Sequence, residues 1–268
     1  VGKVCSVKNK YAKTGSGRVE ALPRPLGQEQ VCRDGPDEEG APEQGEQSGV
    51  APQDEQGGDD DQTSEDDGSS DDTADVVRGL GAHDPRVTLL RLPCNLGKGA
   101  AVRAGMLAAR GARRLFSDAD LSTPIEEYTR LEEALGSADI AIGSRALPDS
   151  RLDKRQPLYR EMMGRTFNLL VQGLVFPGIR DTQCGFKLFR GEVADQIFGR
   201  QRLDGFGFDV EVLFMARKMG LTIREQAIDW YYRDGSSMTF LKGMGGFLDI
   251  ARVRLNWAIG RYRGLNSD

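Results

Sequence analysis

The 268-residue sequence contains a single histidine, His83, and four cysteines that are scattered without a CxxC pair. His83 lies in a Gly-Ala-His-Asp-Pro run that is typical of a turn, so we interpret it as a loop residue. Catalysis by a Ser-His-Asp triad would have to use this one histidine, and the cysteine spacing does not predict a zinc site. The composition is therefore compatible with a reaction that needs no histidine.

Long apolar runs are absent as well. No stretch reaches the roughly 18 apolar residues of a membrane-spanning helix, and the first residues lack the apolar core of a signal peptide. Hydrophobic residues make up 38% of the chain and charged residues 29%, which is ordinary for a soluble or peripheral protein. We therefore expect any membrane contact to be peripheral.

Positive charge is missing from one long stretch. No lysine or arginine occurs from Asp34 to Val77, and half of the residues from Asp54 to Asp75 are acidic. The formal net charge of −5 is concentrated there, and the remainder is basic. A basic remainder suits an anionic substrate or a membrane surface, and we predict no nucleic-acid partner. Residues 1–65 contain one aromatic residue and no regular apolar period, so we predict a disordered segment.

From about residue 66 apolar runs alternate with helical patterns, which predicts an α/β domain with a mostly parallel sheet. We expect strands at 87–92, 114–117, 139–145 and 221–233. We expect helices at 97–110, from 123, at 157–176 and at 208–219. Asn95 is the candidate cap of the first helix, and Thr123 opens a Thr-x-x-Glu capping box in the second.

Residues 239–268 have a different pattern. Apolar residues recur at helical spacing between Phe240 and Ile259, and arginines surround them. This is typical of an amphipathic, basic helix at a membrane interface. A helix packed on the domain's own core is the alternative, and the two are not exclusive.

The motif Asp118-Ala119-Asp120 carries the most chemistry. Two carboxylates two residues apart at the end of a strand can point the same way and share Mg²⁺ or Mn²⁺. The metal would bridge the oxygens of a nucleotide diphosphate. Alone, the motif is equally compatible with a turn followed by a helix cap.

Further blocks accompany this motif in a fixed order. They are Asp66–Thr73 (DDGSSDDT), Asn95–Gly105 (NLGKGAAVRAG), Ser117–Pro124 (SDADLSTP), Gly143–Arg145 (GSR), Asp181–Lys187 (DTQCGFK), Phe208–Glu211 (FDVE) and Arg233–Ser237 (RDGSS). Together they resemble the family 2 glycosyltransferases of GT-A fold, above all the dolichyl- or polyprenyl-phosphate glucosyl- and mannosyltransferases. The resemblance implies a Rossmann-like GT-A domain over residues 66–238.

The resemblance also implies roles for individual residues. The metal and the sugar-nucleotide diphosphate would lie on Asp118 and Asp120. The nucleotide sugar would further contact Asp66, Asp67 and Lys98. Phosphate clamps would be Arg145, Lys187 and Arg233, and other acceptor contacts would be Ser144, Asp181, Gln183 and Ser236. Asp209 and Glu211 would bind sugar hydroxyls, or act as base if the acceptor is an alcohol.

The resemblance begins abruptly at Asp66. The family's first strand and its Pro-x-Tyr-Asn-Glu block are absent, and the polar run 59–65 is not expected to form a buried central strand. One hypothesis is that residues 1–65 are a wrong-frame translation, which reading the upstream DNA in the other frames tests. The rival is a natural acidic tail. As written, the chain is expected to be weakly active or inactive.

The functional prediction is transfer of a hexose, with glucose favoured, from a nucleotide sugar to a polyprenyl or dolichyl phosphate at the cytoplasmic membrane face. A phosphate acceptor is already ionised near neutral pH, so a single inverting displacement needs no general base. The alternatives are a GDP-mannose-dependent mannosyltransferase and a transferase acting on a sugar hydroxyl. A catalytically inactive relic is the alternative of another class.

Overall fold

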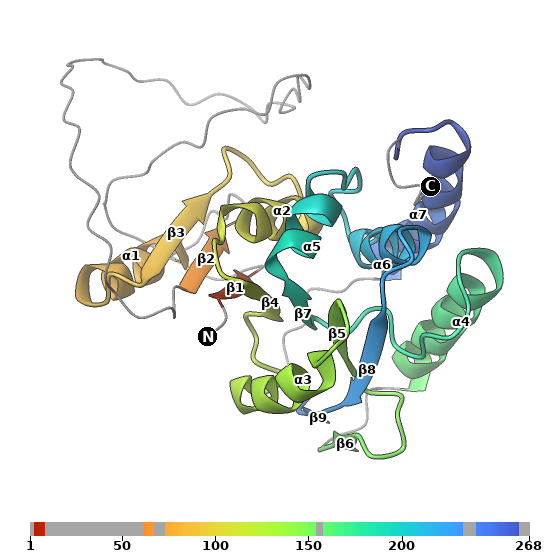
Figure 1. Cartoon of the computed structure of the whole chain (residues 1–268), viewed down its shortest axis with the longest axis horizontal. Helices are drawn as coiled ribbons and strands as arrows, with labels where there is room; N and C mark the ends of the chain where they lie inside the picture. Colours follow the sequence, from red (N-terminus) through yellow and green to blue (C-terminus); the bar gives the residue numbers. More distant parts are fainter. Residues whose placement is uncertain (1–2, 9–61, 67–72, 154–157, 233–239, 263–268) are drawn as a thin grey trace.

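A seven-stranded sheet forms the centre of the computed structural model (Figure 1). The structure describes residues 3–8, 62–66, 73–153, 158–232 and 240–262. The sheet has the strand order β3-β2-β1-β4-β7-β5-β8 and is parallel except for β7, which runs antiparallel to β4 and β5. Its strands are β1 (Lys3–Lys8), β2 (Gln62–Asp66), β3 (Val87–Arg91), β4 (Arg113–Asp118), β5 (Ile140–Ser144), β7 (Phe186–Arg190) and β8 (Ile223–Ala227).

Helices cover both faces of this sheet. The described helices are α1 (Thr73–His83), α2 (Lys98–Ala108), the 3-10 helix η1 (Ile125–Glu127), α3 (Tyr128–Leu135), α4 (Leu158–Leu174), α5 (Gly191–Phe198), α6 (Phe208–Lys218) and α7 (Phe240–Ala258). Figure 1 shows α2 and α5 on the face opposite α3. A second, two-stranded parallel sheet joins β6 (Arg151–Leu152) to β9 (Asp229–Trp230).

Alternating side chains divide the core between the two faces. Phe116 and Phe189 belong to the larger cluster, with α2, α5, α6 and α7, whereas Leu115 and Leu188 belong to the cluster with α3. All four side chains are buried. Since successive residues of a strand point to opposite faces, a continuous apolar run lets one strand supply both clusters.

The structure differs from the expectation for the polar run 59–65, which was not expected to form a central strand. Residues 3–8 and 62–66 are strands, and β2 lies between β1 and β3 although its sequence is Gln-Thr-Ser-Glu-Asp. The prediction weighed side-chain polarity, whereas a parallel ladder is formed by main-chain groups that every non-proline residue carries. Asp66 therefore ends a strand of the central sheet. Residues 9–61 lie outside the described part of the chain.

Most predicted elements are confirmed, but their predicted caps are wrong. The predictions at 87–92, 97–110, 114–117, 139–145, 157–176 and 208–219 correspond to β3, α2, β4, β5, α4 and α6. The N-cap of α2 is Gly97, not Asn95, and at Thr123 the chain forms η1 before α3, with no side-chain cap bond at either helix start. The predicted strand 221–233 divides into β8 and β9, whereas α1, β7 and α5 were not predicted.

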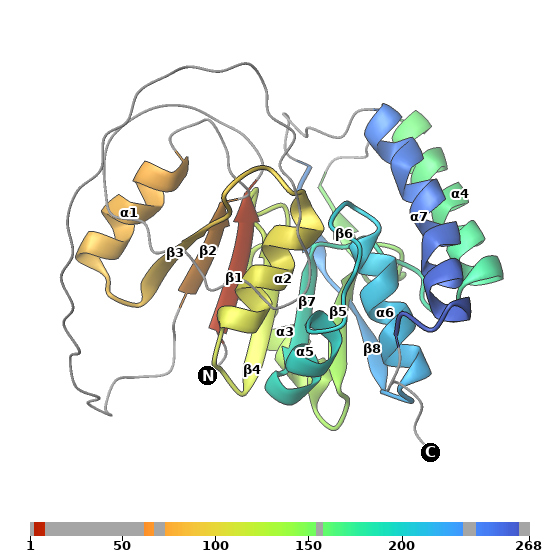
Figure 2. The ribbon, with the colours of Figure 1, turned by 90° about the horizontal axis from the view of Figure 1, so that it is seen from above.

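The predicted C-terminal helix is α7, which packs against α6 and α4 (Figure 2). Val253 and Ile250 are buried, and the Phe167 and Phe247 rings of α4 and α7 meet edge to face at 5.3 Å. Leu255 of the same helix is 58% exposed. The helix therefore packs on the core and also presents apolar side chains to solvent. In the described segments, no helix combines the length and apolarity needed to cross a bilayer.

Candidate active site

The Asp-x-Asp motif lies in a turn at the end of β4. The main-chain N–H of Asp118 donates to the Gly185 carbonyl at 2.8 Å, and the Asp120 carboxylate accepts from the Ser122 N–H at 2.9 Å. Leu121, at the centre of the turn, has a φ of 49°, a left-handed conformation that is uncommon for leucine. Asp120 is exposed and Asp118 is partly exposed. Both predicted metal ligands therefore lie at the carboxyl edge of the sheet.

Gly185 leaves the space that the Asp118 carboxylate occupies. A Cβ atom at position 185 would lie 2.0 Å from Oδ2 of Asp118, closer than any side chain tolerates. The glycine immediately precedes β7, whose antiparallel pairing with β4 brings the two residues together. Packing against Asp118 therefore explains the glycine of the DTQCGFK block.

Lys98 contacts the first aspartate of the motif. It is the first residue of α2, and its Nζ lies 2.7 Å from Oδ1 of Asp118. Burial lowers the pKa of Lys98, but the carboxylates of Asp118, Asp209 and Asp120 together outweigh burial, so the pKa is raised and the side chain is an ammonium ion. Lys98, predicted to contact the nucleotide sugar, is thus at the site.

Two glycines let the start of α2 approach the loop before α6. Gly97 has a φ of 104°, and a Cβ atom there would lie 2.6 Å from the Asp204 carbonyl oxygen. A Cβ atom at Gly99 would lie 2.6 Å from the Leu203 carbonyl oxygen. The Gly-Lys-Gly sequence therefore places Lys98 by close backbone packing, which is how glycine is commonly used near sites.

Lys187 and Asp209 form a buried ion pair behind this site. Their side chains are 1% and 3% exposed, and Lys187 Nζ also donates to the Cys184 carbonyl at 2.5 Å. Burial raises the pKa of Asp209 more than Lys187 and Lys98 lower it. The Lys187 ammonium group is enclosed by protein partners, and Asp209 is enclosed with it. The predicted phosphate clamp at Lys187 and the predicted sugar contact at Asp209 stay predictions.

Glu211 anchors the end of the α7 segment to the loop before α6. Its side chain is buried and accepts hydrogen bonds from the main-chain N–H groups of Arg202 and Leu203, at 3.0 and 2.8 Å, and from the Tyr262 hydroxyl at 2.5 Å. Burial raises the pKa of Glu211 against these hydrogen bonds. The predicted role as a base stays a prediction.

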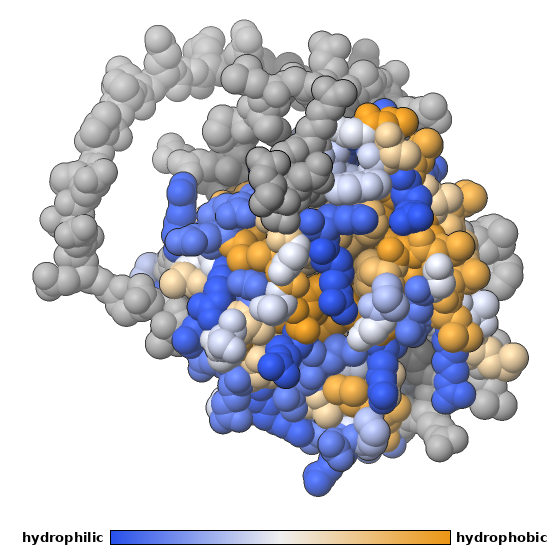
Figure 3. Space-filling view, turned by 45° about the vertical axis from the view of Figure 1, so that its right-hand side comes forward, coloured by the Kyte–Doolittle hydropathy of each residue, from blue (hydrophilic) through white to orange (hydrophobic). Residues whose placement is uncertain are grey.

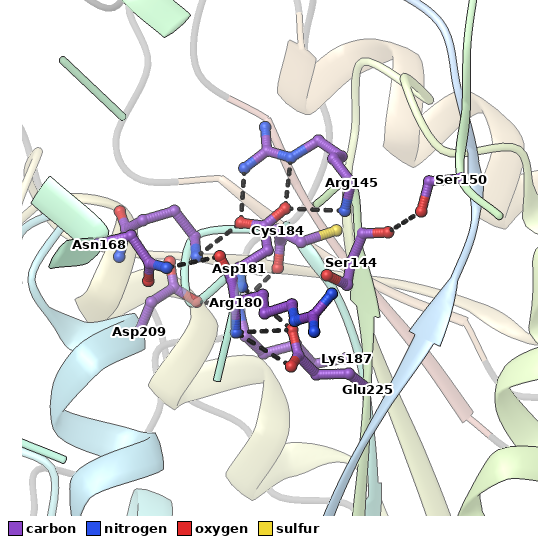
Figure 4. A network of polar contacts seen from close by, with 11 residues as sticks. Ser144, Arg145, Ser150, Asn168, Arg180, Asp181, Cys184, Lys187, Asp209 and Glu225 are labelled. Carbon is purple, nitrogen blue, oxygen red and sulfur yellow. Dashed lines mark hydrogen bonds and ion pairs between the residues drawn. The ribbon is translucent and has the colours of Figure 1, made fainter. Parts of the chain in front are cut away.

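Arg145 and Asp181 form the second ion pair at the edge of the sheet (Figure 4). Arg145 Nε and Nη2 donate to the two Asp181 oxygens at 2.7 and 2.9 Å. The Arg145 main-chain N–H donates to the same carboxylate at 3.0 Å. Burial raises the pKa of Asp181, but Arg145 outweighs burial and the pKa lies below its ordinary value. The guanidinium also lies 5.7 Å from the Trp230 ring centre.

Two residues that the sequence did not single out hold the Asp181 loop. The Glu225 carboxylate of β8 accepts from the main-chain N–H groups of Arg180 and Asp181 at 3.0 Å, and Asn168 Nδ2 of α4 donates to the Arg180 carbonyl at 2.6 Å (Figure 4). Each lies among other polar residues of its element, such as Arg224 and Gln226 in β8 and Arg165 and Thr166 in α4. The sequence therefore carried no signal that singled either residue out.

Of the remaining predicted residues, Ser144 and Gln183 lie in the described part of the chain. Ser144 is buried at the end of β5, where its carbonyl accepts from the Ser150 hydroxyl at 2.6 Å. The main-chain N–H of Gln183 donates to Asp181 at 3.3 Å. Asp67, Arg233 and Ser236 lie outside the described residues.

Asp118 and Asp120 are suitable ligands for a divalent cation whose coordination a nucleotide would complete. Within the described ranges, no three Asp, Glu, His or Cys side chains converge on one point. Carboxylates are suitable hard ligands, and Mg²⁺ commonly takes one or two of them together with substrate phosphate oxygens and water. The space that Gly185 leaves keeps the Asp118 carboxylate at this edge. Together with diphosphate oxygens and water, two carboxylates are enough for such a site.

The strand order, with β7 antiparallel, and the acidic pair after β4 are those of a GT-A glycosyltransferase. The Glycosyl transferase family 2 model matches residues 65–198, and the chain belongs to this family.

Curated relatives match most of the chain. A dolichyl-phosphate beta-glucosyltransferase of Dictyostelium discoideum is 37% identical over 202 residues, which cover 72% of this chain and 62% of the relative. The Homo sapiens protein of the same name is 34% identical over 186 residues, covering 66% and 57%. The chain thus spans about six tenths of the length of these relatives.

Solved structures share the fold. Mannosyl-3-phosphoglycerate synthase of Rubrobacter xylanophilus has a TM-score of 0.53 and 18% identity, covering 78% of this chain and 67% of that one. Glucosyl-3-phosphoglycerate synthase of Mycobacterium tuberculosis, in complex with Mn²⁺, UDP and glucosyl-3-phosphoglycerate, has a TM-score of 0.52 and 15% identity, covering 72% and 68%. At these identities the likeness concerns the GT-A fold alone.

Proposed function

We propose that this protein transfers glucose from UDP-glucose to a dolichyl or other polyprenyl phosphate. The observation that carries the proposal is that the pairs Lys98–Asp118 and Arg145–Asp181 lie at one edge of the sheet, where β4 and β5 end. An acidic pair suits a cation and a diphosphate, and an arginine suits a second phosphate. The relatives' names favour glucose and a lipid phosphate over GDP-mannose or a sugar hydroxyl.

The donor would bind at Asp118 and Asp120 with a divalent cation, Mg²⁺ or Mn²⁺. When bound, this cation would neutralise charge on the leaving diphosphate. Lys98 adds a positive charge at the same place, and Asp66, at the end of β2, is on the same edge of the sheet as Asp118. We retain Asp67, Arg233 and Ser236 as predicted contacts.

The acceptor phosphate would bind at Arg145. An ionised phosphate oxygen can attack the anomeric carbon opposite the leaving diphosphate, and one such displacement inverts the configuration. The phosphate monoester has a second pKa near 6, so no protein base is required at neutral pH. The enclosed positions of Asp209 and Glu211 agree with this mechanism.

Membrane contact would use α4 and α7. Large apolar side chains on their surface are at least one third exposed, namely Met162, Leu169, Leu170, Leu174, Leu248 and Leu255. Figure 3 shows hydrophobic residues gathered on the side of the molecule where these helices lie. An exposed apolar surface of this kind suits peripheral binding to a bilayer. We propose the cytoplasmic face as the location, where a nucleotide sugar is available.

Transfer of radiolabel tests the function. The full chain is incubated with polyprenyl phosphate, Mg²⁺ or Mn²⁺, and labelled UDP-glucose, with GDP-mannose and metal-free samples alongside. Metal-dependent label in the organic phase is expected from UDP-glucose alone. Label from GDP-mannose would change the donor, and UDP binding without label from either donor would favour the inactive relic.

A further inference from the structure

We propose that Lys98 competes with the divalent cation for the Asp118 carboxylate, so that the cation binds tightly only together with the nucleotide diphosphate. The proposal rests on the donor site described under the proposed function. It adds an order to the binding of metal and nucleotide, and it makes Lys98 a positioning residue as well as a donor contact.

The geometry places one cation where another must bind. Lys98 Nζ is 2.7 Å from Oδ1 of Asp118, and the lysine side chain is only 14% exposed. A metal ion approaching Asp118 meets this ammonium group at contact range, where like charges in a partly buried site repel strongly. A cation on Asp118 therefore either shares the carboxylate with this ammonium group at close range or displaces it.

Local packing keeps the lysine in place. Its Nζ lies 5.3 Å and 6.0 Å from the ring centres of Phe116 and Phe208, and the flanking glycines pack against the loop at 203–205. The ammonium group is thus held between two aromatic rings and a carboxylate.

A neighbouring carboxylate inside the protein is already taken. Asp209 follows Phe208, whose ring centre lies 6.0 Å from Lys98 Nζ, but the Asp209 carboxylate pairs with Lys187 in the core. A nucleotide diphosphate removes this restriction, because it brings acceptor oxygens for Lys98 and ligand oxygens for the cation at once. With the diphosphate present, the Lys98 ammonium group and the cation each have an anionic partner. With metal alone, the two positive charges share the Asp118 carboxylate.

Mn²⁺ binding, followed by the electron paramagnetic resonance signal of the free ion, tests the proposal without any turnover. Wild-type protein is titrated with Mn²⁺ in the absence and presence of UDP. We expect Lys98→Met to bind Mn²⁺ at least about tenfold more tightly than wild type when UDP is absent. The ratio of the Kd values without and with UDP should shrink by a similar factor.

Three variants serve as controls. Arg103→Met removes a charge one turn further along α2, where Arg103 pairs with Asp204 at 2.8 Å, and it should leave the Mn²⁺ affinity within about twofold of wild type. Lys98→Arg keeps the charge and should also lack the tenfold gain. Asp118→Asn should lose Mn²⁺ binding in either background. If Lys98→Met fails to fold, Lys98→Gln provides the same comparison.

The outcomes separate this proposal from the proposed function. Unchanged or weaker Mn²⁺ binding by folded Lys98→Met without UDP would overturn the role of Lys98 while leaving the donor site intact. If wild-type protein does not bind Mn²⁺ even with UDP, or if Asp118→Asn binds it equally well, then the donor site itself is wrong.

Discussion

The two ion pairs at the edge of the sheet are built differently. Lys98 meets Asp118 through a contact between Nζ and Oδ1, with side chains that are 14% and 35% exposed. Arg145 meets Asp181 through two guanidinium bonds and one main-chain bond, and Asp181 is only 9% exposed. A lysine is a point charge that can change partners, whereas the arginine fork fixes direction. The donor side is thus exchangeable, and the acceptor side is preorganised.

The largest expected effect comes from Asp118→Asn. Loss of this ligand should lower the rate of transfer by at least about 100-fold, because stabilisation of the leaving diphosphate is lost. Radiolabel transfer at saturating lipid phosphate measures it. Glu133→Gln, an exposed residue of α3, is the matched control and should retain full activity. Comparable losses of transfer in both variants would show that the loss does not depend on the Asp118 ligand.

Gly185→Ala should have the next largest effect. The added Cβ would lie 2.0 Å from Oδ2 of Asp118 and must displace the carboxylate. We expect transfer to fall about tenfold or more, since misplacement of a site group by about 1 Å costs up to 100-fold. Gly173→Ala in α4, where a Cβ would meet nothing within 4 Å, is the control. Full activity of Gly185→Ala would disprove the packing argument.

Asp181→Asn tests the preorganised side. Breaking one partner of a buried pair costs about 3 kcal/mol of stability, and the freed Arg145 should raise KM for polyprenyl phosphate about tenfold. Urea unfolding and lipid titration measure the two effects. Asp118→Asn should leave that KM nearly unchanged, and a rise of equal size in both variants would remove the distinction between donor and acceptor sides.

The same pair has a predictable pH dependence. The pKa of Asp181 is lower in the folded protein than its unfolded value of about 3.9. The unfolded state therefore binds the proton first, so the contribution of the pair is fully present above about pH 4 and is lost as pH falls through the folded pKa. Unfolding of wild type and Asp181→Asn should differ by a constant amount from pH 8 to 5 and converge only below about pH 4.

The smallest expected effect on catalysis is that of Glu211→Gln. Because Glu211 is an anchor, the variant should keep kcat within about threefold while losing about 1–3 kcal/mol of stability. Tyr262→Phe, which removes one of the same hydrogen bonds, should destabilise in the same direction by about 1 kcal/mol. A loss of transfer near 100-fold in folded Glu211→Gln would restore the glutamate as a catalytic residue.

Much of the fold was predictable because its signals are local. Apolar runs at 87–91 and 140–144 and the ranges of α2, α4 and α6 follow from residues next to one another in the chain. The prediction failed at β2. Its sequence is polar, but its main chain pairs with a strand on each side. It also missed β7 and α5, which together span only 186–198 and follow each other directly at Arg190 and Gly191.

The sequence by itself determined the family and the residue types of the site: the Asp-x-Asp pair, the Gly-Lys-Gly turn and the Arg145 and Asp181 blocks. Only the tertiary structure decided which of these charges face the edge of the sheet. Lys187 and Asp209 are enclosed, Glu211 holds Tyr262, and Lys98 reaches Asp118 across twenty positions of chain. The physical reason is that partners depend on strand register and helix packing, which local patterns do not encode.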